Sequence, residues 1–273
     1  MSNDPDRKII LALSLPSAVL MIGVSYAGLF IPGAYAKETL NWTAQAVGQD
    51  AVDLLLISPL LLLTAILAAR GSRAGMFLWS GISLYGVYTF AIYCFDVHFT
   101  RLFIAYCSQL GLSVYSFAFF LHSYKTEAPV HQPENSAPAK ATGVYLIVVA
   151  SIFYLLWLAQ IIPSIIHNTA PSDVVDSGLP TSPVHVLDLA VFLPGIILIG
   201  IFVLRRNPLG FLLAPAALVF VALMCLTIAV LMVVMSAEGF QVNMTLVQIM
   251  SLLAMITLVL LYLFLRRLLM KAP

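Results

Sequence analysis

Charged side chains are scarce in this chain of 273 residues. Asp, Glu, Lys and Arg together make up 9% of it, whereas a soluble domain carries about 25%. Hydrophobic residues make up 62%, which is more apolar surface than a soluble core can bury. This composition excludes a soluble enzyme or a nucleic-acid-binding domain. The sequence therefore predicts an all-α, polytopic membrane protein whose main partner is the lipid bilayer.

Motifs of familiar catalytic chemistry are absent as well. The chain has no Gly-rich phosphate loop, no His-Glu-x-x-His zinc motif and no Gly-x-Ser-x-Gly nucleophile motif. Cys94, Cys107 and Cys225 lie in apolar runs without metal-ligand spacing, so we expect all three to be small buried residues. The last apolar run has no lysine that could carry retinal. No cofactor is predicted.

Long apolar runs are what the chain does contain. Each has about the 20 residues that cross a hydrocarbon core. Ala34-Tyr35-Ala36 after the first run resembles a signal-peptidase site, so cleavage of this run is the alternative. The run exceeds the roughly 7–15 residues of a signal-peptide core, and we expect it to remain as a helix. A polar stretch with three prolines, 125–142, predicts a flexible cytoplasmic linker. The eight predicted spans are 9–32, 50–69, 74–95, 102–124, 144–166, 185–204, 209–235 and 242–265.

One pattern of uncommon residues occurs twice with no gap in register. The pairs, each separated by 135 positions, are Asp53/Asp188, Pro59/Pro194, Arg70/Arg205 and Gly75/Gly210. Asp and Arg number only eight each, so such matches mean more than matches of Leu or Val. The sequence predicts two four-helix repeats, 1–124 and 143–273. Because each has an even number of spans, the repeats are parallel, with a pseudo-two-fold axis along the membrane normal.

The distribution of charge predicts the orientation. If the N-terminus is cytoplasmic, eleven of the thirteen basic residues lie inside, and only Lys37 and Arg101 lie outside. This positive-inside pattern places both termini in the cytoplasm. Eight of the twelve acidic residues fall on the outer side, which predicts an acidic mouth that attracts cations. The alternative is that the topology simply leaves the acids there.

Candidate site residues cluster at this outer side. Asp50 and Asp53 are spaced i, i+3, as are His185 and Asp188, so each pair shares a helix face. Across the pseudo-axis, three carboxylates and an imidazole would hold a divalent metal or share a proton. The alternative is capping of the helix starts, for example by Ser182. Capping explains Asp50 but does not reach Asp188, about 9 Å deeper than the cap. An acid at that depth is a functional-site candidate.

Neighbouring residues complete the predicted site. Pro59 and Pro194 each remove a helical hydrogen bond near mid-membrane, which predicts a kink or hinge, with plain shape-fitting as the alternative. A second group of polar side chains is expected to face inward or lie beside the acids, with interhelical hydrogen bonds or an aromatic belt as the alternatives. This group is Tyr85, Tyr88, Asp96, His98, Gln109, Ser113 and Gln248.

A resemblance covers most of the chain. The segment Ser-Pro-Val-His-Val-Leu-Asp at 182–188, followed by Pro194, resembles the corresponding segment of functionally unassigned multi-pass membrane proteins of bacteria and archaea. Those proteins share the Val-His-Val-Leu-Asp motif and the Gly-Gln-Asp start of the second span. The resemblance implies a prokaryotic cytoplasmic membrane and lends no activity.

Three functional hypotheses follow. The leading one is a proton- or cation-coupled carrier of a small solute, with an outward acidic site between two repeats. The second is a membrane-embedded enzyme with an outward-facing Asp/His site. The third is an accessory or sensory membrane subunit in which the polar cluster is structural. The sequence names neither the solute nor the oligomeric state.

Asp53→Asn or Asp188→Asn should abolish function and leave the melting temperature little changed, because the pair is expected to share a proton or a cation. Asp50→Asn, predicted to lie exposed in a first turn, should do much less. Activity and thermal unfolding are measured for all three variants. Full activity of both deep variants, or unfolding of either, would make the site structural.

Overall fold

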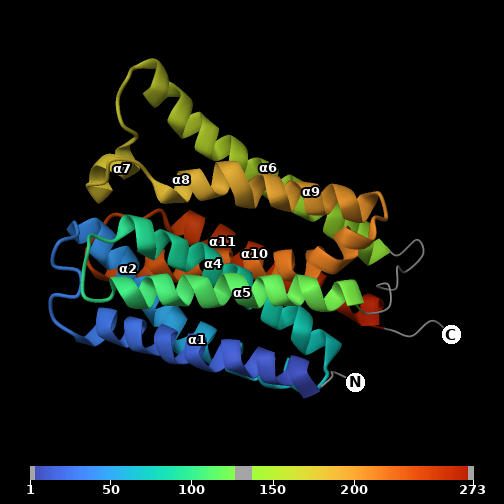
Figure 1. The fold of residues 1–273 in the computed structure, drawn as a ribbon. Helices are drawn as coiled ribbons and strands as arrows, with labels where there is room; N and C mark the ends of the chain where they lie inside the picture. The colour runs from blue at the N-terminus through green and yellow to red at the C-terminus, as the bar shows by residue number, and fades with distance from the viewer. Residues whose placement is uncertain (1–3, 127–136, 270–273) are drawn as a thin grey trace.

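The computed structural model describes residues 4–126 and 137–269, which form helices joined by loops and contain no strand. Eight helices in these ranges are long and apolar enough to cross a membrane, so the all-α, eight-span prediction is confirmed. The start of α1 and the end of α11, the first and last described elements, lie at the same end of the bundle (Figure 1). The elements are α1 (Asp4–Phe30), α2 (Leu40–Val52), η1 (Asp53–Ile57), α3 (Ser58–Ala69), α4 (Arg73–Asp96), α5 (Phe103–Thr126), α6 (Ala137–Ile166), α7 (Ser172–Ser177), α8 (Pro183–Leu187), η2 (Asp188–Phe192), α9 (Leu193–Leu204), α10 (Pro208–Ala237) and α11 (Met244–Leu269).

Helices α4 and α10 pack against each other at the centre of the bundle. Helix α4 also contacts α3 and α5, and α10 also contacts α2, α9 and α11. Figure 1 shows α6 and α9 as a layer on one side of this centre and α1 on the other. In the apolar window of α4, 72% of the residues are buried, the highest share among the eight spans. The centre of the bundle is therefore where polar side chains can be shielded from lipid.

A glycine allows the close approach of α4 and α10. A Cβ atom at Gly81 would overlap the side chain of Val219 and lie 3.0 Å from the carbonyl oxygen of Ala216. In lipid, no hydrophobic effect drives helices together, so their association depends on close packing. Small residues are favoured between membrane helices because they permit this packing. The tight turns between α3 and α4 and between α9 and α10 have the same cause, since Gly75 and Gly210 also lie against the backbone of the preceding span.

Two spans begin seven or more residues earlier than the sequence predicted. Helix α2 starts at Leu40 instead of 50, because Thr39 acts as its N-cap and accepts a hydrogen bond from the N–H of Trp42 at 3.2 Å. Helix α6 starts at Ala137, so 137–142 of the predicted linker is helical. Pro138 lies in its first turn, where a missing N–H costs little. Residues 127–136 of the linker lie outside the described residues.

Several helix boundaries recur with the spacing of the sequence pattern. The boundaries 135 residues apart are the π-turn starts Asp53 and Asp188, the span ends Ala69 and Leu204, and the next helix starts Arg73 and Pro208. The beginnings of these two spans differ, because 13 residues of α2 precede η1 and only five residues of α8 precede η2. The agreement is local, and the four-plus-four repeat stays a prediction.

Gly81→Ala should lower the free energy of unfolding by about 1–3 kcal/mol, because the new methyl group has no space between α4 and α10. Gly111→Ala on α5 is the matched control, since a Cβ there meets nothing within 4 Å. That change should be neutral or stabilise the protein by about 0.5–1 kcal/mol. Thermal unfolding in detergent measures both, and equal melting temperatures for the two variants would contradict the packing at Gly81.

Candidate functional site

A π-helical turn begins at each of the two deep aspartates, Asp53 and Asp188. In both turns, the N–H of the residue that follows bonds to the aspartate's carbonyl oxygen, five residues back. The next residue is Pro59 or Pro194, whose ring would clash with the carbonyl four residues back in a regular helix. The wider turn moves that carbonyl away. The break predicted at the prolines therefore starts at the aspartates, and π-turns are frequent at functional sites.

Asp53 is fully buried, and its two carboxylate oxygens have different surroundings. Oδ1 accepts hydrogen bonds from Nε2 of Gln49 at 3.0 Å and from the hydroxyl of Tyr85 at 3.1 Å. Oδ2 has no hydrogen-bond partner within the described part of the chain. The Tyr85 hydroxyl also lies 3.0 Å from Oγ1 of Thr227 on α10. A buried carboxylate with an unsatisfied oxygen is costly unless it takes up a proton or a cation.

Asp188 is only half-buried and lies at the wall of a cavity of about 370 Å³. Its Oδ2 accepts a hydrogen bond from Nε1 of Trp157 at 2.7 Å, and its carboxylate also interacts with the Tyr88 hydroxyl. Tyr88 and Tyr85 lie one turn apart on α4. Helix α4 thus supplies one tyrosine hydroxyl to each of these two aspartates, Tyr85 to Asp53 and Tyr88 to Asp188.

The cavity lies between α2 and α4 on one side and α6, α8, η2, α9 and α10 on the other. Two carboxylates line it, those of Asp96 and Asp188, and no Lys, Arg or His is among the described residues of its wall. Asp96 is 5% exposed, and its Oδ1 has no hydrogen-bond partner among those residues. On α10 the wall runs from Phe220 to Met235. This is the half of α10 nearer the end opposite the termini, called the acidic end below.

Asp50 is 1% exposed, so its predicted role as an exposed first-turn cap is wrong. Because α2 begins at Leu40, Asp50 lies in the third turn of that helix. Its carboxylate accepts hydrogen bonds from the hydroxyls of Tyr35 at 2.5 Å and Tyr93 at 2.9 Å. Gly28 on α1 leaves room for this cluster, since a Cβ there would overlap the carboxylate. Burial raises the pKa of the Tyr35 hydroxyl, which keeps it a donor.

His185 pairs with an acid of the α6–α8 connection. Ser182 is the N-cap of α8, as predicted, and its hydroxyl accepts a hydrogen bond from the N–H of His185 at 3.3 Å. The imidazole Nε2 lies 2.9 Å from Oδ2 of Asp173 on α7, and its ring packs edge-on against Trp157. The described residues hold no group of three or more His, Cys, Asp or Glu side chains that could bind a metal ion.

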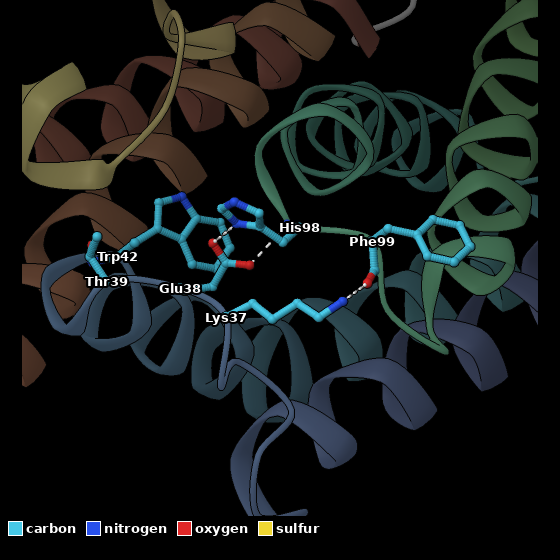
Figure 2. A network of polar contacts seen from close by, with 6 residues as sticks. All are labelled: Lys37, Glu38, Thr39, Trp42, His98 and Phe99. Atoms are coloured by element: carbon cyan, nitrogen blue, oxygen red, sulfur yellow. Dashed lines mark hydrogen bonds and ion pairs between the residues drawn. The ribbon is translucent and has the colours of Figure 1, made fainter.

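His98 takes part in a set of polar contacts that joins two loops at the acidic end (Figure 2). Glu38 accepts a hydrogen bond from the backbone N–H of His98 at 2.8 Å and lies 2.9 Å from its Nδ1. Lys37 donates to the carbonyl oxygen of Phe99 at 2.8 Å. These bonds join the α1–α2 loop to the α4–α5 loop beside the start of α2.

The predictions for the remaining polar side chains, Gln109, Ser113 and Gln248, differ in their outcomes. Gln109 donates to the hydroxyl of Ser17 at 2.8 Å and so joins α5 to α1. Ser113 packs against α4 at Gly86, which has no side chain to block it. Gln248 was expected to point inward, and this is wrong because it is exposed. The buried stripe of α11 instead runs through Met250, Ala254, Thr257 and Leu261.

The three cysteines differ in how deeply they are buried. Cys225 is buried and lines the cavity. Cys94 is half-buried and Cys107 is exposed, with their sulfur atoms 3.9 Å apart. The prediction of three buried residues is therefore wrong for Cys107, because apolar runs in a membrane protein face lipid as often as they face the core.

Sequence reasoning missed Gln49, Trp157 and Tyr35 as partners of the acids. Gln49 lies four residues before Asp53 on one helix face, so its spacing was a usable signal. Trp157 carries an indole N–H that needs an acceptor inside an apolar span, which was a second signal. Tyr35 lies in a loop, and nothing in the sequence links it to Asp50.

Eight apolar helices around a polar centre define a multi-pass α-helical membrane protein. The chain matches no protein-family model, no curated protein and no solved structure. The resemblance based on the Val-His-Val-Leu-Asp motif therefore stays a prediction.

Tyr93→Phe should lower the free energy of unfolding by about 1–3 kcal/mol, because it removes one of the two hydroxyls that bond to the buried Asp50 carboxylate. Tyr115→Phe is the control, since this tyrosine is 67% exposed on α5. Thermal unfolding of the two variants in one detergent gives the comparison. An unchanged melting temperature for Tyr93→Phe would show that this hydrogen bond does not stabilise the fold.

Proposed function

We propose that the protein is a secondary carrier that couples the movement of a small solute to a proton or another cation. It lies in a prokaryotic cytoplasmic membrane with both termini in the cytoplasm. The observation that carries this proposal is the pair of π-turns that begin at Asp53 and Asp188, each within a membrane helix. Irregular helix geometry is frequent at functional sites, and carriers built from repeats bind their solutes and ions at irregular helices near mid-membrane.

The packing of the helices supports two related halves. Helix α1 packs on α3 as α6 packs on α9, and α3 packs on α4 as α9 packs on α10. The pairs α4–α5 and α10–α11 correspond in the same way, and α4 meets α10 between the halves. This is the set of contacts that a parallel four-plus-four repeat with a central pseudo-two-fold axis produces.

The two aspartates differ in exposure. In an alternating-access cycle, the enclosed aspartate would become exposed and the exposed aspartate would become enclosed. Asp53 is sealed by Gln49 and Tyr85, whereas Asp188 borders the cavity. Because Tyr85 and Tyr88 are both on α4, a movement of this helix would change the hydrogen bonding of both acids together. A proton or cation taken up by one acid would thereby bias the exposure of the other.

One observation favours the alternative of an enzyme or a sensor. The lining of the cavity on α10 stops at Phe220, and the contact of Gly81 with Val219 lies directly beyond it. The cavity thus reaches from the acidic end to mid-membrane in this conformation. A carrier must open this contact, whereas an enzyme or a sensor can keep it closed.

The native Cys225 tests which description holds, because it lines the cavity. In a Cys94→Ser, Cys107→Ser background it is the sole cysteine. A carrier should let a membrane-impermeant trimethylammonium methanethiosulfonate modify Cys225 from either face of oriented vesicles, because alternating access exposes the site to both. Mass spectrometry of the protein measures the modification.

Asp176→Cys in a cysteine-free background is the control for sidedness, since Asp176 is exposed beyond the membrane ends of the helices. It should react from one face only. Reaction of Cys225 from that same face alone would contradict the carrier and favour an enzyme or a sensor.

A further inference from the structure

We propose that the cavity binds an organic cation with one positive charge and an apolar body, and that Asp96 receives the cationic head. This inference deepens the proposed carrier function, because it names the class of solute that would occupy the cavity. It also applies if the cavity belongs to a receptor, since it concerns binding alone.

The charges of the wall select a cation. Asp96 and Asp188 are the acidic side chains of the wall, and its described residues include no basic one. Asp188 already accepts a hydrogen bond from Trp157, whereas Oδ1 of Asp96 is buried without a partner in the described chain. Asp96 is part of the cavity wall, and its buried oxygen lacks a compensating hydrogen bond. Such a carboxylate is a position for an incoming positive charge, which it can meet by a rotation of its side chain.

Two aromatic side chains accompany Asp96 in the cavity wall. Tyr93 lies three residues before Asp96 on α4, so the two share a helix face. Trp42 packs edge-on against Tyr93, with ring centroids 6.3 Å apart, and also lines the cavity. Carboxylate and aromatic faces together are the combination that recognises alkylammonium groups, because ring faces attract cations without competing as hydrogen-bond partners.

The rest of the wall fits an apolar body. Phe153, Phe220 and three methionines, Met224, Met232 and Met235, contribute to it, and aliphatic side chains make up most of the remainder. Methionine adapts its shape to different apolar ligands. The volume of about 370 Å³ lies within the range of small-molecule sites, roughly 300–1,000 Å³.

Other solute classes fit less well. A sugar or an amino acid requires many converging hydrogen-bond partners, and this wall offers few. A small inorganic cation requires several oxygen ligands around one point, and no such cluster of acids occurs in the described residues. An anion would meet two carboxylates and no positive charge. An apolar ammonium ion satisfies both the free carboxylate and the apolar wall.

Binding to the purified protein in detergent tests this inference without a transport assay. The probes are benzyltrimethylammonium, its neutral isostere neopentylbenzene, and the anion phenylmethanesulfonate. Tryptophan fluorescence reports binding, because Trp42 and Trp157, two of the three tryptophans, line the cavity. Partition of each probe into protein-free micelles is subtracted. Benzyltrimethylammonium should bind at least about tenfold more tightly than the isostere, and the anion should not bind.

Asp96→Asn should weaken benzyltrimethylammonium binding by about tenfold or more and leave neopentylbenzene binding unchanged. Asp176→Asn is the matched control and should change neither. If Asp96→Asn fails to fold, Trp42→Leu serves instead, and it should weaken binding of the cation more than that of the isostere. Equal binding of cation and isostere, binding of the anion, or cation binding that survives both variants would overturn the inference.

The outcomes separate this inference from the carrier proposal. Selective cation binding with one-sided labelling of Cys225 would keep the ligand class and reject the carrier. Two-sided labelling without selective cation binding would keep the carrier and reject the ligand class.

Discussion

Buried carboxylates in an apolar bundle are the constraint on which the rest of this structure depends. The buried Asp50 and Asp53 and the half-buried Asp188 are held by neutral donors, namely tyrosine, glutamine and tryptophan side chains. No lysine or arginine of the described chain forms an ion pair with them. Neutral donors satisfy oxygen atoms but leave the negative charge uncompensated. The bundle therefore retains a need for a proton or a cation from outside, and this need is the physical basis of the proposed function.

This constraint also explains why α4 lies at the centre. It supplies Tyr85, Tyr88 and Tyr93 to three different acids, each on a different turn or face. A helix with so many hydroxyl groups cannot face lipid without cost, so it must be covered on all sides. Close packing at Gly81 provides this cover towards α10. Covering α4 and holding the acids are thus two consequences of the same arrangement.

The fold class was predictable from the sequence because apolar runs of membrane length have few alternative structures. The two aspartates and an irregularity of their helices were predictable as well, since Asp53 and Asp188 are uncommon residues in register with prolines. The start of α2 was not predictable from hydrophobicity, because the segment 41–50 mixes polar and apolar residues and is nevertheless helical and packed against the rest of the bundle. That error placed Asp50 at the surface. The exposed Gln248 was missed because lipid-facing and core-facing positions carry the same apolar neighbours.

The two spans that contain the π-turns differ in the length of helix before the turn, and this difference matches the surroundings of their aspartates. In the first of these spans, α2 continues for 13 residues before η1 and packs against α10, and both Asp50 and Asp53 are buried. In the second, only five residues of α8 precede η2, and Asp188 is half-buried at the wall of the cavity. A long helical segment before the π-turn thus accompanies an enclosed acid, whereas a short one accompanies an acid that borders open space.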